Sequence, residues 1–324
     1  MPSVSIRPLW QNPLRRMLRS WSGTGWLPGY QYQIMQRWGA RLSDGGSVSA
    51  TLPNGCVMQC DLRDEVQRQI YFLGAYEPIE AFLFSHLLQP GMTVVDAGAN
   101  VGQFSLLAST AVGPAGRVHS FEPIPANMHK LSDHVRTNAC HNVVLNAAAL
   151  WHEATELSLG SPEHLENAGT FSVGLCNQGP VVSANAVTLD QYAAERKLIR
   201  LDMIKMDIEG AEWFALRGAR QTLTKFAPLI LLEVCQTTCE RLDYDTSKIF
   251  ELLKSLGYRA WRIGQSCKET LELDNLHGIQ QANVIFAVSQ PNWPKSWDLK
   301  SCLKWAHSSA IPAISQRTLP RNAA

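Results

Sequence analysis

Between residues 91 and 288 the chain alternates short apolar runs with amphipathic stretches, and this alternation constrains the fold more than any other feature. The apolar runs have the length and composition of buried strands, and helical patterning follows most of them. Strands that alternate with helices indicate a doubly wound α/β domain, whose mostly parallel sheet is covered on both faces. The predicted strands cover residues 92–96, 116–122, 142–145, 201–207, 229–234, 258–263 and 283–288.

One interval, residues 150–201, departs from this alternation. β-rich pieces at residues 155–159, 169–174 and 181–189 stand where a single helix is expected, which predicts a β-rich insertion. Such an insertion lies beside the carboxyl edge of the sheet, where ligands of these folds bind. It is either a substrate-facing element or a hairpin that only extends the sheet.

The two ends of the chain differ from its middle in composition. Residues 1–70 form an N-terminal extension with a helix and a β-hairpin, whose strands are predicted at 47–52 and 57–62 around the turn Pro53-Asn54-Gly55. Residues 291–324 begin with a stretch rich in Ser and Pro and are expected to trail along the surface as a tail. Residues 71–290 are therefore expected to form the main domain.

Composition limits the partners and the compartment. Lys plus Arg is 29 and Asp plus Glu is 28, so the chain lacks the basic surplus typical of nucleic-acid-binding proteins. Its 8 cysteines contain no CxxC pair, which favours free thiols in a reducing compartment. No apolar run is long enough to span a membrane, and prolines and arginines interrupt the start of the chain. We therefore expect a soluble, cytoplasmic protein without a transmembrane segment.

The most informative segment is the run Asp96-Ala97-Gly98-Ala99-Asn100-Val101-Gly102. A strand that enters a glycine-rich turn and then a helix can bind a negatively charged group. Glycine allows close approach to the backbone, and helix N–H groups attract anions. Three residues separate Gly98 from Gly102, unlike the G-x-G-x-x-G spacing of nicotinamide-binding folds, and the Gly-Lys-Ser/Thr of a Walker loop is absent.

Further acids are predicted at the same edge of the sheet. Glu122 closes the second strand, 122 − 96 = 26 positions after Asp96, where an acid can accept both ribose hydroxyls of a nucleotide. Asp207 and Glu209 follow a later strand. Because parallel strands end at one edge, we expect Asp96, Glu122 and Asp207 to face one crevice. Glu212 is equally well explained as an acid that favours the dipole of the next helix.

Together these segments resemble the FkbM-type family of class I S-adenosylmethionine-dependent methyltransferases. The resemblance covers roughly residues 69–288 and depends mainly on residues 96–102 and 204–212, with further matches at 76–78, 121–123, 127, 187–190, 233–234 and 283. It implies a seven-stranded sheet with an antiparallel last strand, S-adenosylmethionine as methyl donor, and methylation of a hydroxyl. The implied acceptor is a small molecule or glycan, such as a carbohydrate or a polyketide-like natural product. The cofactor-binding residues that it implies are Glu77, Asp96, Gly98, Asn100, Gly102, Glu122, Pro123 and Asp207.

Methyl transfer to a hydroxyl requires in-line alignment and a group that removes the hydroxyl proton. Asp207 is the first candidate, either as the base or as a ligand of the donor's ammonium group, and Glu209 beside it is the second. His164 and His152, in or near the insertion, are alternative bases. Asp207 and Glu233 end adjacent strands, so a variant in which they bind magnesium as oxygen ligands stays open.

Two other classes of function also stay open. The first is a nicotinamide-dependent oxidoreductase, which shares the strand, the glycine turn and the later acid, although the glycine spacing argues against it. The second is a non-catalytic module that binds S-adenosylmethionine, although the intact motif residues argue against such a loss of activity. The sequence does not specify the acceptor. It does not specify the oligomeric state either, so a homo-oligomer stays open.

Overall fold

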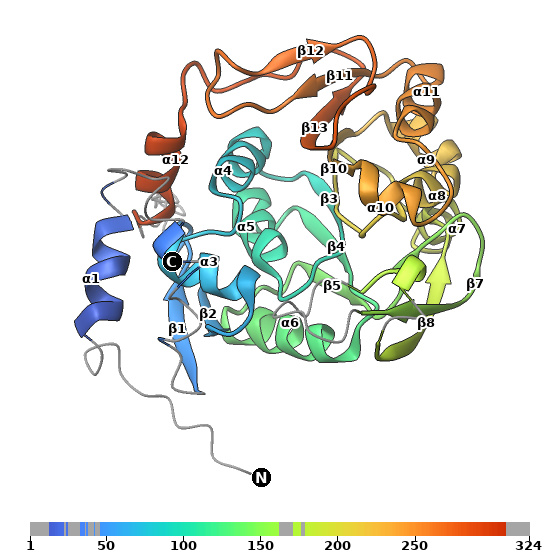
Figure 1. The fold of residues 1–324 in the computed structure, drawn as a ribbon. Helices are drawn as coiled ribbons and strands as arrows, with labels where there is room; N and C mark the ends of the chain where they lie inside the picture. The colour runs from blue at the N-terminus through green and yellow to red at the C-terminus, as the bar shows by residue number, and fades with distance from the viewer. Residues whose placement is uncertain are drawn as a thin grey trace, which may run out of the picture.

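The computed structural model describes residues 13–22, 24, 33–35, 37, 42, 46–161, 171–175 and 179–308. Within these residues the centre is an eight-stranded sheet with the order β12-β11-β13-β10-β9-β3-β4-β5 (Figure 1). The strands from β5 to β10 are parallel, whereas β13, β11 and β12 pair antiparallel at the other end. Their bounds are β3 (Thr93–Ala97), β4 (Arg117–Phe121), β5 (Val143–Asn146), β9 (Met203–Met206), β10 (Leu229–Cys235), β11 (Arg259–Arg262), β12 (Leu271–Leu273) and β13 (Gln281–Ala287).

This architecture confirms the predicted doubly wound, mostly parallel sheet. The seven strands predicted for the main sheet all form, with small shifts at their ends. The antiparallel last strand is β13, which lies between β10 and β11. The strand beyond the implied seven is β12, a short segment that pairs with β11 at the edge of the sheet.

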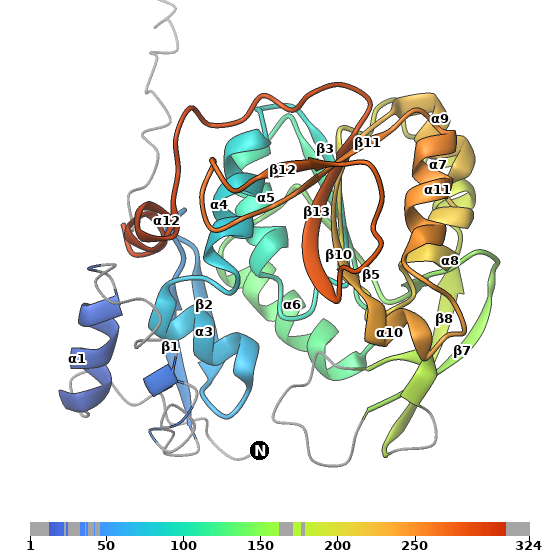
Figure 2. The same cartoon turned by 45° about the horizontal axis from the view of Figure 1, so that its top comes forward.

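Helices cover both faces of the sheet (Figure 2). Val94 and Val95 are consecutive in β3 but belong to different apolar clusters, because successive side chains of a strand point to opposite faces. This double burial explains why the strands read as near-continuous apolar runs. One face packs on α4 (Pro78–Leu87), α5 (Gln103–Val112) and α6 (Pro125–Thr137), and the other on α7 (Leu189–Glu195), α8 (Glu212–Arg217), α9 (Arg220–Phe226) and α11 (Ser247–Ser255).

The predicted N-terminal hairpin is present as β1 (Ser47–Thr51) and β2 (Val57–Asp61), which pair antiparallel. With α1 (Pro13–Ser22) and α3 (Glu65–Leu73) it encloses an apolar cluster that also includes Val101, Leu106, Cys140 and Leu303. His134 of α6 links this hairpin to the glycine-rich turn. Its Nε2 accepts from Gln59 N–H at 3.0 Å, and its Nδ1 lies 2.8 Å from the Val101 carbonyl oxygen.

The insertion forms a separate three-stranded sheet with the order β6-β8-β7. Its strands are β6 (Ala149–Leu150), β7 (Thr155–Gly160) and β8 (Val181–Val187), which confirms its predicted β-rich character. It does not pair with the central sheet among the described residues, so the alternative of a hairpin that only extends that sheet is wrong. Of the strand-like piece predicted at 169–174, residues 169 and 170 lie outside the described residues, and Val173–Leu175 forms a 3-10 turn.

The expectation that the chain trails along the surface after residue 290 is wrong for the part that the structure describes. A helix, α12 (Leu299–Ala306), begins at the cap residue Asp298 and packs against α4. Trp297, Cys302 and Ala306 are buried. The apolar side chains of α12 recur at helical spacing, and this signal outweighs the Ser and Pro content on which the expectation depended.

No helix among the described residues is long and apolar enough to cross a membrane.

If α12 belongs to the core, the substitution Leu303→Ala will lower the free energy of unfolding by about 2–4 kcal/mol, because it opens a cavity at a side chain that is 2% exposed. Urea unfolding followed by circular dichroism measures this change. The neighbouring Lys304→Ala changes an exposed side chain and is expected to alter stability by less than about 0.5 kcal/mol. Equal small effects of both substitutions would contradict the packing of α12.

Candidate functional site

Charged side chains follow the carboxyl ends of three neighbouring strands on one face of the sheet. Asp96 of β3 is in register with Lys205 of β9, and both lie on the face that packs against α4 and α5. Asp207 follows two positions after Lys205, and Glu233 of β10 comes one position after the pair Leu232–Met206. The alternation of side chains therefore places all four on the same face, while the opposite face stays apolar.

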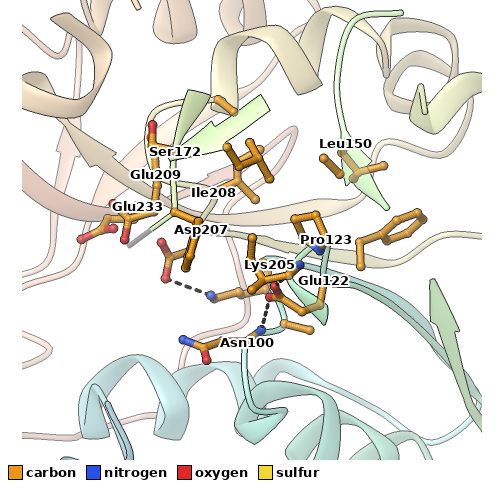
Figure 3. A pocket seen from close by; sticks show the side chains of 18 of the residues that line it. Asn100, Glu122, Pro123, Leu150, Ser172, Lys205, Asp207, Ile208, Glu209 and Glu233 are labelled. Atoms are coloured by element: carbon orange, nitrogen blue, oxygen red, sulfur yellow. Dashed lines mark hydrogen bonds and ion pairs between the residues drawn. The ribbon is translucent and has the colours of Figure 1, made fainter. Parts of the chain in front are cut away.

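A pocket lies at this carboxyl edge (Figure 3). Asp207, Glu209 and Glu233 form one side of it, and Pro123 and Leu150 lie on the opposite side. The predicted residues that line the pocket are Gly98, Asn100, Gly102, Glu122, Pro123, Asp207, Glu209 and Glu233. Two predicted residues, Asp96 and Glu77, are not among its lining residues.

Asp96 is fully buried next to the pocket rather than in its wall. Its Oδ2 accepts a hydrogen bond from Ser105 Oγ at 2.6 Å, and Ser105 Oγ lies 2.6 Å from Ser120 Oγ. Burial raises the pKa of Asp96, while the charge of Lys205 opposes that rise. Asp96 therefore influences the pocket through its interactions with the start of α5 and with Lys205.

The two glycines of the turn are required by neighbouring parts of the chain. Gly98 has a φ of +76°, its N–H donates to the Phe121 carbonyl at 3.0 Å, and a Cβ there would lie 1.8 Å from the Asp207 carbonyl oxygen. Gly102 has a φ of +99°, and a Cβ there would lie 2.5 Å from Leu131 Cδ1. Close packing of the turn against β9 and α6 is thus a second reason for glycine, besides the predicted approach of a ligand.

Glu122 is held in a fixed orientation by the backbone. Its Oε2 accepts from Asn100 N–H at 2.8 Å and its Oε1 accepts from Ile124 N–H at 2.9 Å. Burial raises the pKa of Glu122 to about 7, although these hydrogen bonds favour its ionised form. The side-chain Oδ1 of Asn100 is buried and has no partner among the described residues, so this wall offers an acceptor to a ligand that donates.

The turn after β9 is held from several sides. Ile208 N–H and Gly210 N–H both donate to Glu212 Oε1, at 2.9 and 3.3 Å. Ser172 Oγ of the insertion donates to the Glu209 carbonyl at 2.8 Å. Glu212 therefore fastens this turn, which accounts for its position without a role in the pocket wall. Glu209 is presented to the pocket by a turn that both the domain and its insertion hold.

Three non-glycine residues around the pocket have left-handed backbone conformations. They are Glu77 (φ 48°), Asn100 (φ 49°) and Glu209 (φ 55°). Such a conformation costs about 1–3 kcal/mol for a residue other than glycine and persists only where the surroundings impose it. Asn tolerates it better than Glu does. The same conformation occurs away from the pocket at Ala139, Lys197, Ala227 and Asp243, so it shows how tightly these turns are held and does not identify the pocket.

Lys205 lines the pocket but was not among the site residues that the sequence predicted. Its Nζ lies 3.1 Å from Asp207 Oδ2 and 4.8 Å from the centre of the Phe104 ring, and its side chain is 7% exposed. Burial alone would lower the pKa of Lys205, but Asp207, Asp96 and Glu77 more than offset this and raise it, so the amine stays charged. An ionisable residue between the isoleucine and the methionine of an apolar strand was the signal that could have revealed it.

Several carboxyl groups near the pocket bind their protons more tightly than usual. Burial, and then repulsion by Asp207, raises the pKa of Glu233 to about 10 and that of Glu209 to about 8. Burial, and then Glu80, raises the pKa of Glu77 to about 8. A cation bound among these groups would favour their ionised forms. The pocket is therefore electrostatically suited to a positively charged ligand.

The magnesium variant gains no support from the structure. Within the described residues no group of three or more His, Cys, Asp or Glu side chains is arranged to hold a metal ion. Asp207 faces the amine of Lys205, and Glu233 Oε1 accepts from Gln281 Nε2 at 2.7 Å. Of the alternative bases, His152 is not among the pocket-lining residues, and His164 lies outside the described residues.

Comparisons with known proteins give one family and several distant relatives. The model of the methyltransferase FkbM domain matches residues 96–260. Methyltransferase 1 of Beauveria bassiana is 26% identical over 183 residues, which cover 51% of this chain and 71% of that protein. The 31-O-demethyl-FK506 methyltransferase FkbM of Streptomyces tacrolimicus is 26% identical over 158 residues, which cover 40% of this chain and 60% of that protein.

Among solved structures, methyltransferase FkbM from Methylobacillus flagellatus is 16% identical with a TM-score of 0.41. The match covers 69% of this chain and 55% of that one, so the chain spans about half the length of that protein.

The raised pKa of Glu233 predicts that stability falls as pH rises. Its folded value of about 10 exceeds the ordinary 4.5, so the folded state binds the proton more tightly, and its stabilising effect is lost progressively above about pH 4.5. The free energy of unfolding of the wild-type protein should fall between about pH 6 and about pH 8. In Glu233→Gln we expect this fall to be smaller by about 1–2 kcal/mol, because glutamine has no proton to lose.

Urea unfolding of the unliganded protein at several pH values measures this dependence. Glu240→Gln, which changes an exposed side chain, serves as the matched control and is expected to leave the slope unchanged. A Glu233→Gln slope that equals the wild-type slope would show that this carboxyl group does not hold its proton in the folded state.

Proposed function

The chain belongs to the FkbM methyltransferase domain family, and from this premise we propose that it transfers the methyl group of S-adenosylmethionine to a hydroxyl of a carbohydrate or a polyketide-like natural product. One observation carries the proposal. The glycine-rich turn, a fixed strand-end acid and several proton-holding carboxyl groups surround a single pocket at the carboxyl edge of the sheet. Such a pocket suits a ligand that has a nucleoside at one end and a positive charge at the other.

The residues present fit the cofactor. Glu122 would hold the ribose hydroxyls, because Asn100 N–H and Ile124 N–H fix the orientation of its carboxyl group. The unpartnered Asn100 Oδ1 would accept from a donor of the same ligand. Asp207 would face the ammonium group or the reacting hydroxyl. Gly98 and Gly102 keep the turn close to these groups.

S-adenosylmethionine would supply a methyl group bound to a cationic sulfonium, and the acceptor oxygen would attack the methyl carbon as the carbon–sulfur bond breaks. The chain must hold the acceptor hydroxyl in line with that bond and take up the hydroxyl proton. Carboxylate oxygens of the pocket receive this proton in our proposal, with Asp207 as first and Glu209 as second candidate. Lys205 limits the repulsion between Asp207 and Asp96, which allows these acids to stay close together.

The walls of the pocket support an acceptor with an apolar skeleton and free hydroxyls. Leu157, Leu159 and Phe171 of the insertion give one part of the lining an apolar character, whereas Glu209 and Glu233 offer hydrogen-bond acceptors. The relative from Streptomyces tacrolimicus is named as a methyltransferase of 31-O-demethyl-FK506, a small-molecule acceptor, which agrees with this proposal. The cysteines among the described residues are free thiols, which supports the proposal of a cytoplasmic protein.

Binding of the cofactor tests the site. We expect isothermal titration calorimetry to detect S-adenosylmethionine binding to the wild-type protein. Asp207→Asn should weaken it at least about tenfold, because Lys205 loses its ion-pair partner and the ligand loses a counter-charge. Asp274→Asn, which changes an exposed side chain, should leave the affinity unchanged. An Asp207→Asn affinity equal to that of the wild type would show that Asp207 does not contact the cofactor.

Activity is tested separately with methyl-labelled S-adenosylmethionine and a panel of hydroxylated sugars and polyketides. Transfer of label to a hydroxyl oxygen supports the proposal. Binding of NADH with no binding of S-adenosylmethionine would favour an oxidoreductase. Binding of S-adenosylmethionine without transfer to any acceptor of the panel would favour a non-catalytic module.

A further inference from the structure

Tyr76 lines the pocket. The side chain of Gln103 holds the backbone of Tyr76 in place. Tyr76 N–H donates to Gln103 Oε1 at 2.7 Å, and Gln103 Nε2 donates to the Tyr76 carbonyl at 2.8 Å. Gln103 is the first residue of α5, directly after the glycine-rich turn, and is 4% exposed. This reciprocal pair fixes the segment before α4 against the start of α5.

The phenol of Tyr76 is a neutral group in an acidic part of the pocket. The hydrogen bonds that Tyr76 forms with Gln103 use its backbone N–H and carbonyl and leave its hydroxyl uninvolved. Burial, and then the nearby carboxyl groups, raises the pKa of the Tyr76 phenol, so it keeps its proton. The carboxyl groups that act on it belong to Glu77, Asp207, Glu233 and Glu209.

The carboxyl groups of the pocket can accommodate a cation beside this ring. Among the described residues that line the pocket, Lys205 is the one lysine or arginine, and its amine is already paired with Asp207. The other carboxyl groups around Tyr76 have no such partner in the lining. A sulfonium carries a permanent charge but no N–H or O–H, so hydrogen bonds cannot neutralise it. An aromatic face and oxygen lone pairs are the contacts that stabilise such a cation.

This inference rests on the proposed function. We propose that Tyr76 contacts the sulfonium centre of S-adenosylmethionine and thereby distinguishes the cationic donor from the neutral thioether product, S-adenosylhomocysteine. Gln103 is the positioning residue that holds Tyr76 in this place.

Paired titrations with S-adenosylmethionine and S-adenosylhomocysteine test the proposal without an acceptor. Tyr76→Leu removes the ring and the hydroxyl, and we expect the Kd for S-adenosylmethionine to rise about fivefold to twentyfold. The Kd for S-adenosylhomocysteine should change less than about twofold, because it has no charge at sulfur. Tyr76→Phe keeps the ring and should lose less discrimination than Tyr76→Leu.

Gln103→Leu tests the positioning role. It removes both hydrogen bonds to Tyr76 and should reduce the discrimination between the two ligands in the same direction. Tyr258→Phe is the matched control, because the Tyr258 hydroxyl is buried without a partner and lies outside the pocket lining. Melting temperatures of all variants show whether they are folded.

The outcomes separate this inference from the proposed function. If Tyr76→Leu loses affinity for both ligands equally, or for neither of them, the proposed contact with the sulfonium is wrong. Unchanged discrimination in folded Gln103→Leu overturns the positioning role. A wild-type protein that binds neither ligand contradicts the proposed function itself.

Discussion

The structure of the site depends on the burial of one positive charge, the amine of Lys205, in the middle of a parallel sheet. A buried ammonium group is tolerated only when carboxylates surround it. Asp207 supplies the nearest one at 3.1 Å, and Asp96 and Glu77 act from a neighbouring strand and from the start of α4. One charge thus ties together segments that are distant in sequence. Removal of any of these acids would leave part of that charge uncompensated.

Side-chain hydrogen bonds and close packing hold the backbone around the pocket in place. Glu77, Asn100 and Glu209 keep costly left-handed conformations because hydrogen bonds and close packing around them leave no alternative. Glu212 fastens the turn of Glu209, and Asn283 Nδ2 donates to Glu77 Oε1 at 3.1 Å. Polar groups held in this way need little rearrangement when a ligand arrives, and pre-organisation reduces the cost of binding.

The sequence was sufficient to predict the parts that local patterns determine. Apolar runs specified the strands, and the order of strands and helices placed Glu122 and Asp207 at one edge. Lys205 was not predicted as part of the site, because its burial beside Asp96 depends on which strands become neighbours. Tyr76 was quoted only within the family match at 76–78, and its pairing with Gln103, 27 positions away, was not predicted. The packing of α12 depends on α4, a helix more than two hundred positions earlier, so composition alone gave the wrong expectation of a surface tail.

The position of β13, near the end of the chain, determines which fragments of this protein can keep the pocket intact. Gln281 of β13 holds Glu233, and Asn283 of the same strand holds Glu77 and Glu80. A fragment trimmed to the family-matched residues 96–260 would lose this strand and would also lose Tyr76. It would retain the recognisable motifs without the groups that orient them. The part of the chain that keeps the pocket intact is accordingly larger than the stretch that the family model matches.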